Sequence, residues 1–306
     1  MGKKLIFLDL DGTALTDDKK LPEGNRRAID EALAAGHKIV VTTGRPLASA
    51  RKQAERHGLA GPGSYIVAYN GGLIYDVEHG QTIFQQTIDL QTVREVFAEA
   101  ARRGVHIQAY RGEKVLVDPR NDDAELQSYC RLIEIDYEVI PDIADLEDEP
   151  VKMHSSTLAL QPHGRDSAVA EPDKGLVALR DWINENYPDT LDAFLSAPVY
   201  LEIVSHGMSK GIAVHKMAEL LGYPIEDTIA IGDEANDIPM IREAGIGAAM
   251  CNGLAAAREA ADYVTRADNN HDGVAEVIRK FVLSEGDREP SPVTSYKRSV
   301  PADFWL

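Results

Sequence analysis

The sequence has few cysteines and no long apolar run. Its two cysteines, Cys130 and Cys251, are far apart and lack metal-like spacing. Each is therefore expected to be a small buried hydrophobe rather than a disulfide partner or a zinc ligand. No apolar stretch approaches the length of a membrane span. The apolar run near the N-terminus is shorter than that of a signal peptide and is interrupted by Asp9. These absences predict a cytoplasmic protein without a membrane partner.

Positive charge is also scarce. The chain carries 32 Lys and Arg residues against 50 Asp and Glu residues, so its formal net charge is -18 at pH 7. Such a field repels nucleic acids and anionic membranes, so a polyanionic partner is not expected. A small phosphate could still bind where a local cation or a metal ion offsets the charge. The histidines show no H-x-x-x-H spacing, which favours structural roles for them, His271 included.

Short apolar segments alternate with helical segments at both ends of the chain. This rhythm is typical of an α/β fold, in which helices cover both faces of a parallel, Rossmann-like sheet. The predicted strands lie near residues 5–10, 37–44, 65–72, 228–237, 246–250 and 262–265. The middle of the chain instead mixes hairpin-like strand pairs with helices, which predicts an inserted α+β module.

The length of 306 residues favours more than one domain. The patterns predict a catalytic core over residues 1–81 and 201–284 and a cap over 82–200. A tail over 285–306 is rich in Pro and Ser but finishes on three apolar residues, Phe304, Trp305 and Leu306. We expect these three to dock on the body of the protein or on a neighbouring subunit. The oligomeric state is left open.

Acidic residues follow two of the predicted buried strands. Asp9 and Asp11 come at the end of the first strand, and Asp233 and Asp237 follow the strand that starts near residue 228. The carboxyl ends of parallel strands meet at one edge of a sheet, where ligands of such folds bind. Four carboxylates gathered there repel one another unless a divalent cation lies between them. Hard oxygen ligands in a loose cluster suit Mg²⁺.

Groups suited to phosphate occur in two other segments. Thr43, Gly44 and Arg45 follow a third buried strand, and a hydroxyl, free backbone N–H groups and a helix N-terminus all suit phosphate oxygens. Lys210 lies at a strand-to-helix junction. Taken alone, a lysine at such a place is more often a surface residue.

The order of these four segments is specific. They read D-x-D-G-T, T-G-R, a lysine before a helix, and G-D-x-x-N-D. In this order the chain resembles the haloacid dehalogenase superfamily of phosphohydrolases, and most closely its Cof-type branch, whose large cap is inserted between the second and third motifs. The resemblance extends over about residues 3–284.

The resemblance implies a role for each matching residue. Asp9 would be the nucleophile that forms an aspartyl-phosphate, and Asp11 would be the acid and then the base. Asp9, the backbone carbonyl of Asp11, and Asp233 would hold Mg²⁺. The remaining assignments are Asp237 as support for the metal shell, Thr43, Gly44 and Lys210 as phosphate ligands, and Arg45, Asn70 and Asn236 as possible substrate contacts.

Three positions depart from the pattern of the family. Ala14 replaces the Leu or Val that is commoner after D-x-D-G-T, a packing change that affects no catalytic role. Glu234 stands where a small residue is frequent, and it is expected either to point to solvent or to weaken phosphate binding slightly. Asn252 is assigned the role of an Asn that the family usually carries in a Gly-Asn-Ala turn. In the cap, Lys152 and Glu202 could contact substrate, but salt-bridged or solvated placement is favoured for both.

These observations predict a Mg²⁺-dependent phosphatase that acts on a small phosphorylated metabolite, with a sugar phosphate favoured. Two alternatives stay open at this point. A sugar phosphomutase would use the same aspartyl-phosphate but return the phosphoryl group to a sugar. A non-catalytic phosphometabolite-binding module would bind Mg²⁺ without turnover, although the acid–base carboxylate of Asp11 argues against it.

Overall fold

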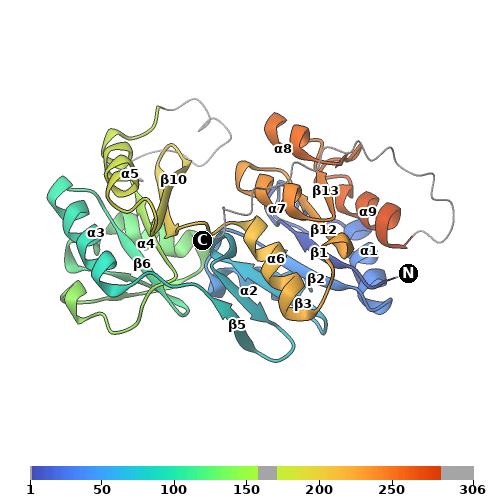
Figure 1. Ribbon diagram of the computed structural model, residues 1–306, viewed down its shortest axis with the longest axis horizontal. Coiled ribbons are helices and arrows are strands. Elements are labelled where there is room, and N and C mark those ends of the chain that lie inside the picture. The colour runs from blue at the N-terminus through green and yellow to red at the C-terminus, as the bar shows by residue number, and fades with distance from the viewer. Residues whose placement is uncertain (1, 158–170, 284–306) are drawn as a thin grey trace.

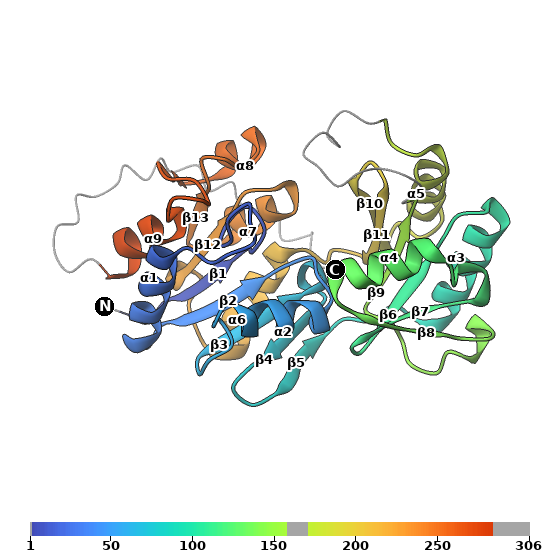
Figure 2. The ribbon, with the colours of Figure 1, turned by 180° about the vertical axis from the view of Figure 1, so that it is seen from behind.

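The chain forms two lobes side by side, each built on its own sheet (Figure 1). The structure is a computed structural model, and it describes residues 2–157 and 171–283. The lobe that contains both ends of the described chain is called the core here, and the other lobe is called the cap. Figure 2 shows the same two lobes from behind, with α2 of the core next to α4 of the cap.

The core sheet of the described chain has eight strands in the order β14-β13-β12-β1-β2-β3-β4-β5. The strands from β14 to β3 pair in parallel, and β4 and β5 extend the sheet as an antiparallel hairpin. The bounds are β1 Leu5–Leu8, β2 Lys38–Thr42, β3 Ser64–Ala68, β4 Leu73–Asp76, β5 Gln81–Gln85, β12 Thr228–Gly232, β13 Ile246–Ala249 and β14 Tyr263–Val264.

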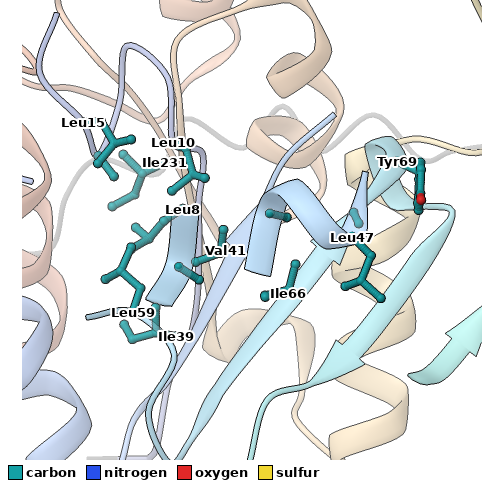
Figure 3. Close-up of a cluster of buried hydrophobic side chains, with 14 of the residues drawn as sticks. Leu8, Leu10, Leu15, Ile39, Val41, Leu47, Leu59, Ile66, Tyr69 and Ile231 are labelled. Atoms are coloured by element: carbon teal, nitrogen blue, oxygen red, sulfur yellow. The ribbon is translucent and has the colours of Figure 1, made fainter. Parts of the chain in front are cut away.

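The central strands β1, β3 and β12 of this sheet are fully buried, and helices cover both of its faces. In β1, Ile6 and Leu8 join one apolar cluster, whereas Leu5 and Phe7 join another on the opposite face. Figure 3 shows part of the first cluster. The helices are α1 Glu23–Ala34, α2 Leu47–Arg56, α6 Lys210–Leu221, α7 Ile238–Glu243, α8 Ala255–Ala260 and α9 Gly273–Ile278, with short turns η1 Tyr69–Gly71, η5 Ile225–Asp227, η6 Ala235–Asp237 and η7 Arg279–Leu283.

The cap sheet has six strands within the described residues, in the order β10-β11-β9-β6-β7-β8. One of its faces is apolar and packs against α3 and α5. The strands are β6 Gln108–Arg111, β7 Lys114–Val117, β8 Asp136–Val139, β9 Lys152–Ser156, β10 Leu191–Ala197 and β11 Tyr200–Ser205; the helices are α3 Leu90–Arg103, α4 Ala124–Ile133 and α5 Lys174–Asn186, with short turns η2 Pro119–Asn121 and η3 Ile143–Asp145.

The fold confirms the predicted α/β class with an α+β insertion, but both predicted boundaries of the cap are displaced. Residues 82–85 belong to β5, which pairs with the core strand β4. Residues 201–205 belong to β11, which pairs with the cap strands β9 and β10. Strand pairing partners are set by the tertiary fold, so local sequence pattern could not assign these two strands to a sheet.

The predicted tail over 285–306, including the docking of Phe304, Trp305 and Leu306, lies outside the described residues. None of the helices in the described part of the chain has the length and apolar character needed to cross a membrane.

Candidate active site

The ends of three neighbouring strands bring the predicted site residues together. Asp9 follows β1, Thr43 follows β2 and Asp233 follows β12, and these strands are adjacent and parallel. Their backbones continue the sheet, since Asp9 N–H donates to the Ile231 carbonyl at 3.0 Å. All three side chains are buried. The register of the sheet therefore places two acids and a hydroxyl at one edge.

Lys210 connects two of the acids. Its Nζ donates to Oδ1 of Asp9 and to Oδ1 of Asp237, each at 2.6 Å. Lys210 is the first residue of α6, whose N-cap residue Ser209 accepts from Ile212 N–H, so the start of the helix fixes the position of the lysine. The side chains of Lys210 and Asp237 are fully buried. The sequence left open that Lys210 could be a surface residue, and the structure shows that it is not.

Asp9, Asp233 and Asp237 form a cluster in which one carboxylate oxygen from each lies within 4.8 Å of the others. With Lys210, this buried group carries three negative charges and one positive charge when all four residues are ionised. Burial raises the pKa of Asp9 well above its usual range despite Lys210, and it raises the pKa of Asp233 to about 7. The cluster therefore lacks positive charge, which a divalent cation would supply.

The hydrogen bonds show which oxygens could bind a cation. Asp237 uses Oδ1 for Lys210, and its Oδ2 accepts from the backbone N–H groups of Asp233 and Glu234 at 2.9 Å each. Asp233 Oδ1 accepts from the Thr13 hydroxyl at 2.6 Å. Within the described residues, Oδ2 of Asp9 and Oδ2 of Asp233 receive no hydrogen bond. These two oxygens fit a hard cation, whereas Asp237 supports the cluster.

Asp11 lies apart from this cluster. Arg45 donates to its Oδ2 from Nε at 3.0 Å and from Nη2 at 2.8 Å, and Lys19 Nζ donates to Oδ1 at 2.7 Å. Burial alone would raise the pKa of Asp11, but Arg45 and Lys19 outweigh it and lower that pKa. The next residue, Gly12, has φ +84°, and a Cβ atom there would lie 2.3 Å from Oδ2 of Asp233. Glycine is therefore required at this turn.

The segment Thr43–Arg45 forms a loop at the end of β2. The Thr43 hydroxyl accepts from Arg45 N–H at 3.2 Å. Asn70 lies next to this loop, and its Oδ1 accepts from Nδ2 of Asn236 at 3.1 Å. A Cβ atom at Gly44 would lie 2.9 Å from Oδ1 of Asn70, so a larger residue there would displace the Asn70 side chain. The predicted substrate contacts Asn70 and Asn236 thus contact each other beside the loop.

The other candidate residues also have definite positions. Asn252 donates from Nδ2 to the Gly12 carbonyl at 2.8 Å, which supports the turn after Asp11. Glu234 is exposed to solvent, which was one of the two expectations for this residue. Lys152 and Glu202 form a buried ion pair with each other, which confirms the salt-bridged placement favoured from the sequence. His271 contacts Asp268 at the surface.

Sequence reasoning did not assign a role to the side chain of Thr13 or to Lys19. Thr13 is the Thr of the D-x-D-G-T motif, so its contact with Asp233 had a signal in the sequence. Lys19 lies eight residues after Asp11 in an exposed turn. No local pattern marks that lysine, because only the folded loop returns it to the strand end.

Comparison with known proteins agrees with this geometry. The family model of haloacid dehalogenase-like hydrolases matches residues 6–278. The chain belongs to this family. It is 31% identical over 286 residues to a Streptococcus pyogenes protein named as a candidate phosphatase, with 93% of this chain and 100% of that protein covered. It is 30% identical to a Bacillus subtilis 5-amino-6-(5-phospho-D-ribitylamino)uracil phosphatase, with 92% and 96% covered.

Solved structures show the same fold. A haloacid dehalogenase-like hydrolase from Bacteroides thetaiotaomicron superposes with a TM-score of 0.78 at 27% identity, covering 91% of this chain and 99% of that one. Family membership and the phosphatase relatives make this haloacid dehalogenase-like protein an enzyme, a phosphoric monoester hydrolase.

Proposed function

We propose that the enzyme is a Mg²⁺-dependent cytoplasmic phosphatase that hydrolyses a small phosphorylated metabolite, a sugar phosphate or a related polyol phosphate, through an aspartyl-phosphate on Asp9. The observation that carries the proposal is the buried cluster of Asp9, Asp233, Asp237 and Lys210, with two carboxylate oxygens free of hydrogen bonds within the described chain. The Bacillus subtilis relative named for a phosphoribitylamino substrate supports a phosphorylated sugar alcohol as the substrate class.

In the first step, a carboxylate oxygen of Asp9 attacks phosphorus while the bond from phosphorus to the substrate oxygen breaks. Lys210 donates to Oδ1 of Asp9 and would hold the carboxylate in place, so that one of its oxygens attacks phosphorus and the other can bind the cation. Asp11 in its protonated form gives its proton to the departing alkoxide. The Thr43 hydroxyl, Gly44 N–H and Lys210 bind the oxygens of the transferring phosphoryl group and offset its charge.

In the second step, Asp11 takes a proton from a water molecule, which attacks phosphorus and releases Asp9 and inorganic phosphate. Arg45 and Lys19 lower the pKa of Asp11, which favours the ionised form that acts as the base here. The proton that Asp11 gives up in the first step would come from the monoanion of the bound phosphate ester. Asp9, the Asp11 carbonyl and Asp233 would hold the magnesium ion, with Asp237 as support. When bound, the metal neutralises phosphate charge and orients the phosphoryl group.

The test is phosphate release from a panel of sugar phosphates, polyol phosphates and nucleotides, with Mg²⁺ or with EDTA. We expect activity only with Mg²⁺, and a loss of at least about 10³-fold in Asp9→Asn. Asp30→Asn on the exposed face of α1 is the matched control and should retain full activity. Wild-type activity in Asp9→Asn would refute the nucleophile assignment.

The same panel separates hydrolysis from the alternatives drawn from the sequence. A phosphomutase would convert a hexose 1-phosphate into another sugar phosphate without releasing free phosphate. A binding module would turn over none of the compounds.

A further inference from the structure

The loop Thr43–Arg45 has a donor next to each of its three carbonyl groups. The Thr43 carbonyl accepts from Asn70 N–H at 3.1 Å, and the Arg45 carbonyl accepts from Tyr69 N–H at 3.1 Å. Both donors belong to the core. The remaining carbonyl, that of Gly44, lies 3.5 Å from Nζ of Lys152, which belongs to the cap strand β9. The cap therefore provides the third contact.

These contacts of the carbonyl groups determine the direction in which the N–H groups of the loop point. In a trans peptide the C=O and the N–H point in opposite directions. Because the Thr43 carbonyl is turned toward Asn70, the Gly44 N–H points the other way, and it meets no acceptor within the described residues. Glycine permits many backbone conformations, so Gly44 does not hold its own carbonyl in place. If that carbonyl turned toward the phosphoryl group, its partial negative charge would repel the phosphate oxygens.

Lys152 is well placed to prevent this. Its side chain is 3% exposed, and it forms an ion pair with Glu202 of β11. Glu202 is in turn held by Ser196, whose hydroxyl donates to Oε1 at 2.9 Å. The Lys152 ammonium also lies 5.6 Å from the ring centre of Tyr110, which stands beside it on β6. Glu202 and the ring of Tyr110 thus hold the ammonium beside the Gly44 carbonyl.

Stability alone does not account for this buried ion pair. Taking an ammonium and a carboxylate out of water is costly, and apolar side chains of similar volume often replace such pairs without loss of stability. Replacement of the pair would, however, remove the positive charge that faces the Gly44 carbonyl. The cap sheet keeps an apolar face for its own core against α3 and α5, and Lys152 lies on the opposite face.

We propose that Lys152 is a positioning residue that the cap supplies to the phosphate-binding loop: it holds the Gly44 carbonyl away from the phosphoryl group and is itself held by Glu202. The inference rests on the proposed function, because it takes Thr43 and Gly44 as the phosphate ligands. It also means that the phosphate-binding loop is complete only when the cap is seated on the core.

The test uses variants that keep the packing of the cap. Lys152→Met/Glu202→Gln removes both charges at nearly constant volume, so no buried charge is left unpaired. Lys114→Met/Glu138→Gln is the matched control, because it makes the same two changes at a pair on strands β7 and β8, 3.1 Å apart and partly exposed. For each variant we would measure kcat, KM, the inhibition constant of inorganic phosphate, and Tm.

We expect the first variant to bind inorganic phosphate about tenfold more weakly and to lose tenfold or more in kcat/KM, while its Tm stays near that of the control. Lys152→Arg, which keeps the charge next to Gly44, should recover part of the loss. Wild-type phosphate inhibition and kcat/KM in Lys152→Met/Glu202→Gln would overturn the proposal. A loss seen with sugar phosphates but absent for inorganic phosphate would also overturn it, since Lys152 would then contact the leaving group.

Two further measurements keep the proposal falsifiable. If the neutral variant does not fold, the exchange Lys152→Glu/Glu202→Lys keeps an ion pair but places a carboxylate next to the Gly44 carbonyl. It should lose more phosphate affinity than Lys152→Arg, and equal affinity would overturn the proposal. If the wild-type enzyme shows no Mg²⁺-dependent phosphatase activity, the proposed function fails, and calorimetric titration of the same variants with inorganic phosphate still decides the role of Lys152.

Discussion

Arg45 donates two hydrogen bonds to the same carboxylate oxygen of Asp11, at 3.0 and 2.8 Å, whereas Asp9 is bound by Lys210. The two aspartates are separated by one residue, yet their surroundings differ. Asp9 is buried against Lys210, and its pKa is raised, whereas Asp11 is partly exposed between Arg45 and Lys19, and its pKa is lowered. This difference suits a division of labour between a nucleophile and a proton-transfer group.

The first prediction concerns the two roles of Asp11. In Asp11→Asn, kcat for a sugar phosphate should fall by about 10²–10⁴-fold, because the variant lacks the carboxyl group that protonates the leaving group and activates the water molecule. With p-nitrophenyl phosphate the first step needs no proton, since nitrophenolate is a good leaving group. Stopped-flow absorbance should then show a burst of about one equivalent of nitrophenol, followed by slow turnover. Equal losses for both substrates without a burst would contradict the assignment of the base.

The second prediction concerns the metal. Binding of Mg²⁺ to the folded state alone should stabilise the enzyme by about 2.7 kcal/mol at a hundredfold excess over Kd, which is about 5–10 °C in Tm. Asp233→Asn removes a cation ligand and one buried negative charge. It should lose the Mg²⁺-induced shift, yet in EDTA it should be at least as stable as the wild-type enzyme. Scanning calorimetry at constant ionic strength measures both effects.

The control for the metal prediction is Asp30→Asn, which changes the net charge equally at an exposed site and should keep the full shift. A Mg²⁺-induced shift of wild-type size in Asp233→Asn would place the ion elsewhere.

The acids and the lysine of the site could be predicted from the sequence because each follows an apolar strand or starts a helix. Parallel pairing then brings Asp9 and Asp233 to one edge of the sheet whatever the details of packing. The contacts of Lys19 and Lys152 could not be predicted in this way. Both depend on how a loop or an entire sheet packs on the core. The spacing of apolar residues in the sequence does not indicate that packing. The two displaced boundaries of the cap have the same cause.

The third prediction concerns the acid sensitivity of the cap. Burial lowers the pKa of His154 to about 3, against 6.5 in the unfolded chain. The folded state therefore favours the neutral ring. The contribution of His154 to the free energy of unfolding is complete above pH 6.5 and is lost as the pH falls toward 3. At pH 5 the loss is about 2 kcal/mol. His154→Phe keeps the stacking on Tyr129 and should lose about 2 kcal/mol less than the wild-type enzyme between pH 7.5 and pH 5.

Urea denaturation at the two pH values measures this difference. A pH dependence in His154→Phe equal to that of the wild-type enzyme would show that His154 does not contribute to acid unfolding.

The fourth prediction concerns the contact between α2 and the cap. Arg56 donates to both carboxylate oxygens of Glu134, at 2.9 and 2.8 Å, and Arg51 contacts Glu113 at 2.5 Å. These pairs are partly exposed, so together they are worth about 1 kcal/mol for the seated cap. Arg51→Gln/Arg56→Gln should therefore favour the open cap and raise KM roughly fivefold. Raising NaCl from about 50 to 500 mM should weaken the same pairs in the wild-type enzyme.

The control for this contact is Arg102→Gln/Arg103→Gln on α3, which removes two positive charges that pair with Glu99 within the same helix. It separates the effect of the contact from the general attraction between the enzyme and an anionic substrate. We expect the α2 variant alone to combine a raised KM with a reduced response of KM to salt, because the charges that salt would screen are already absent. If both variants respond to salt like the wild-type enzyme, the ion pairs of α2 do not hold the cap on the core.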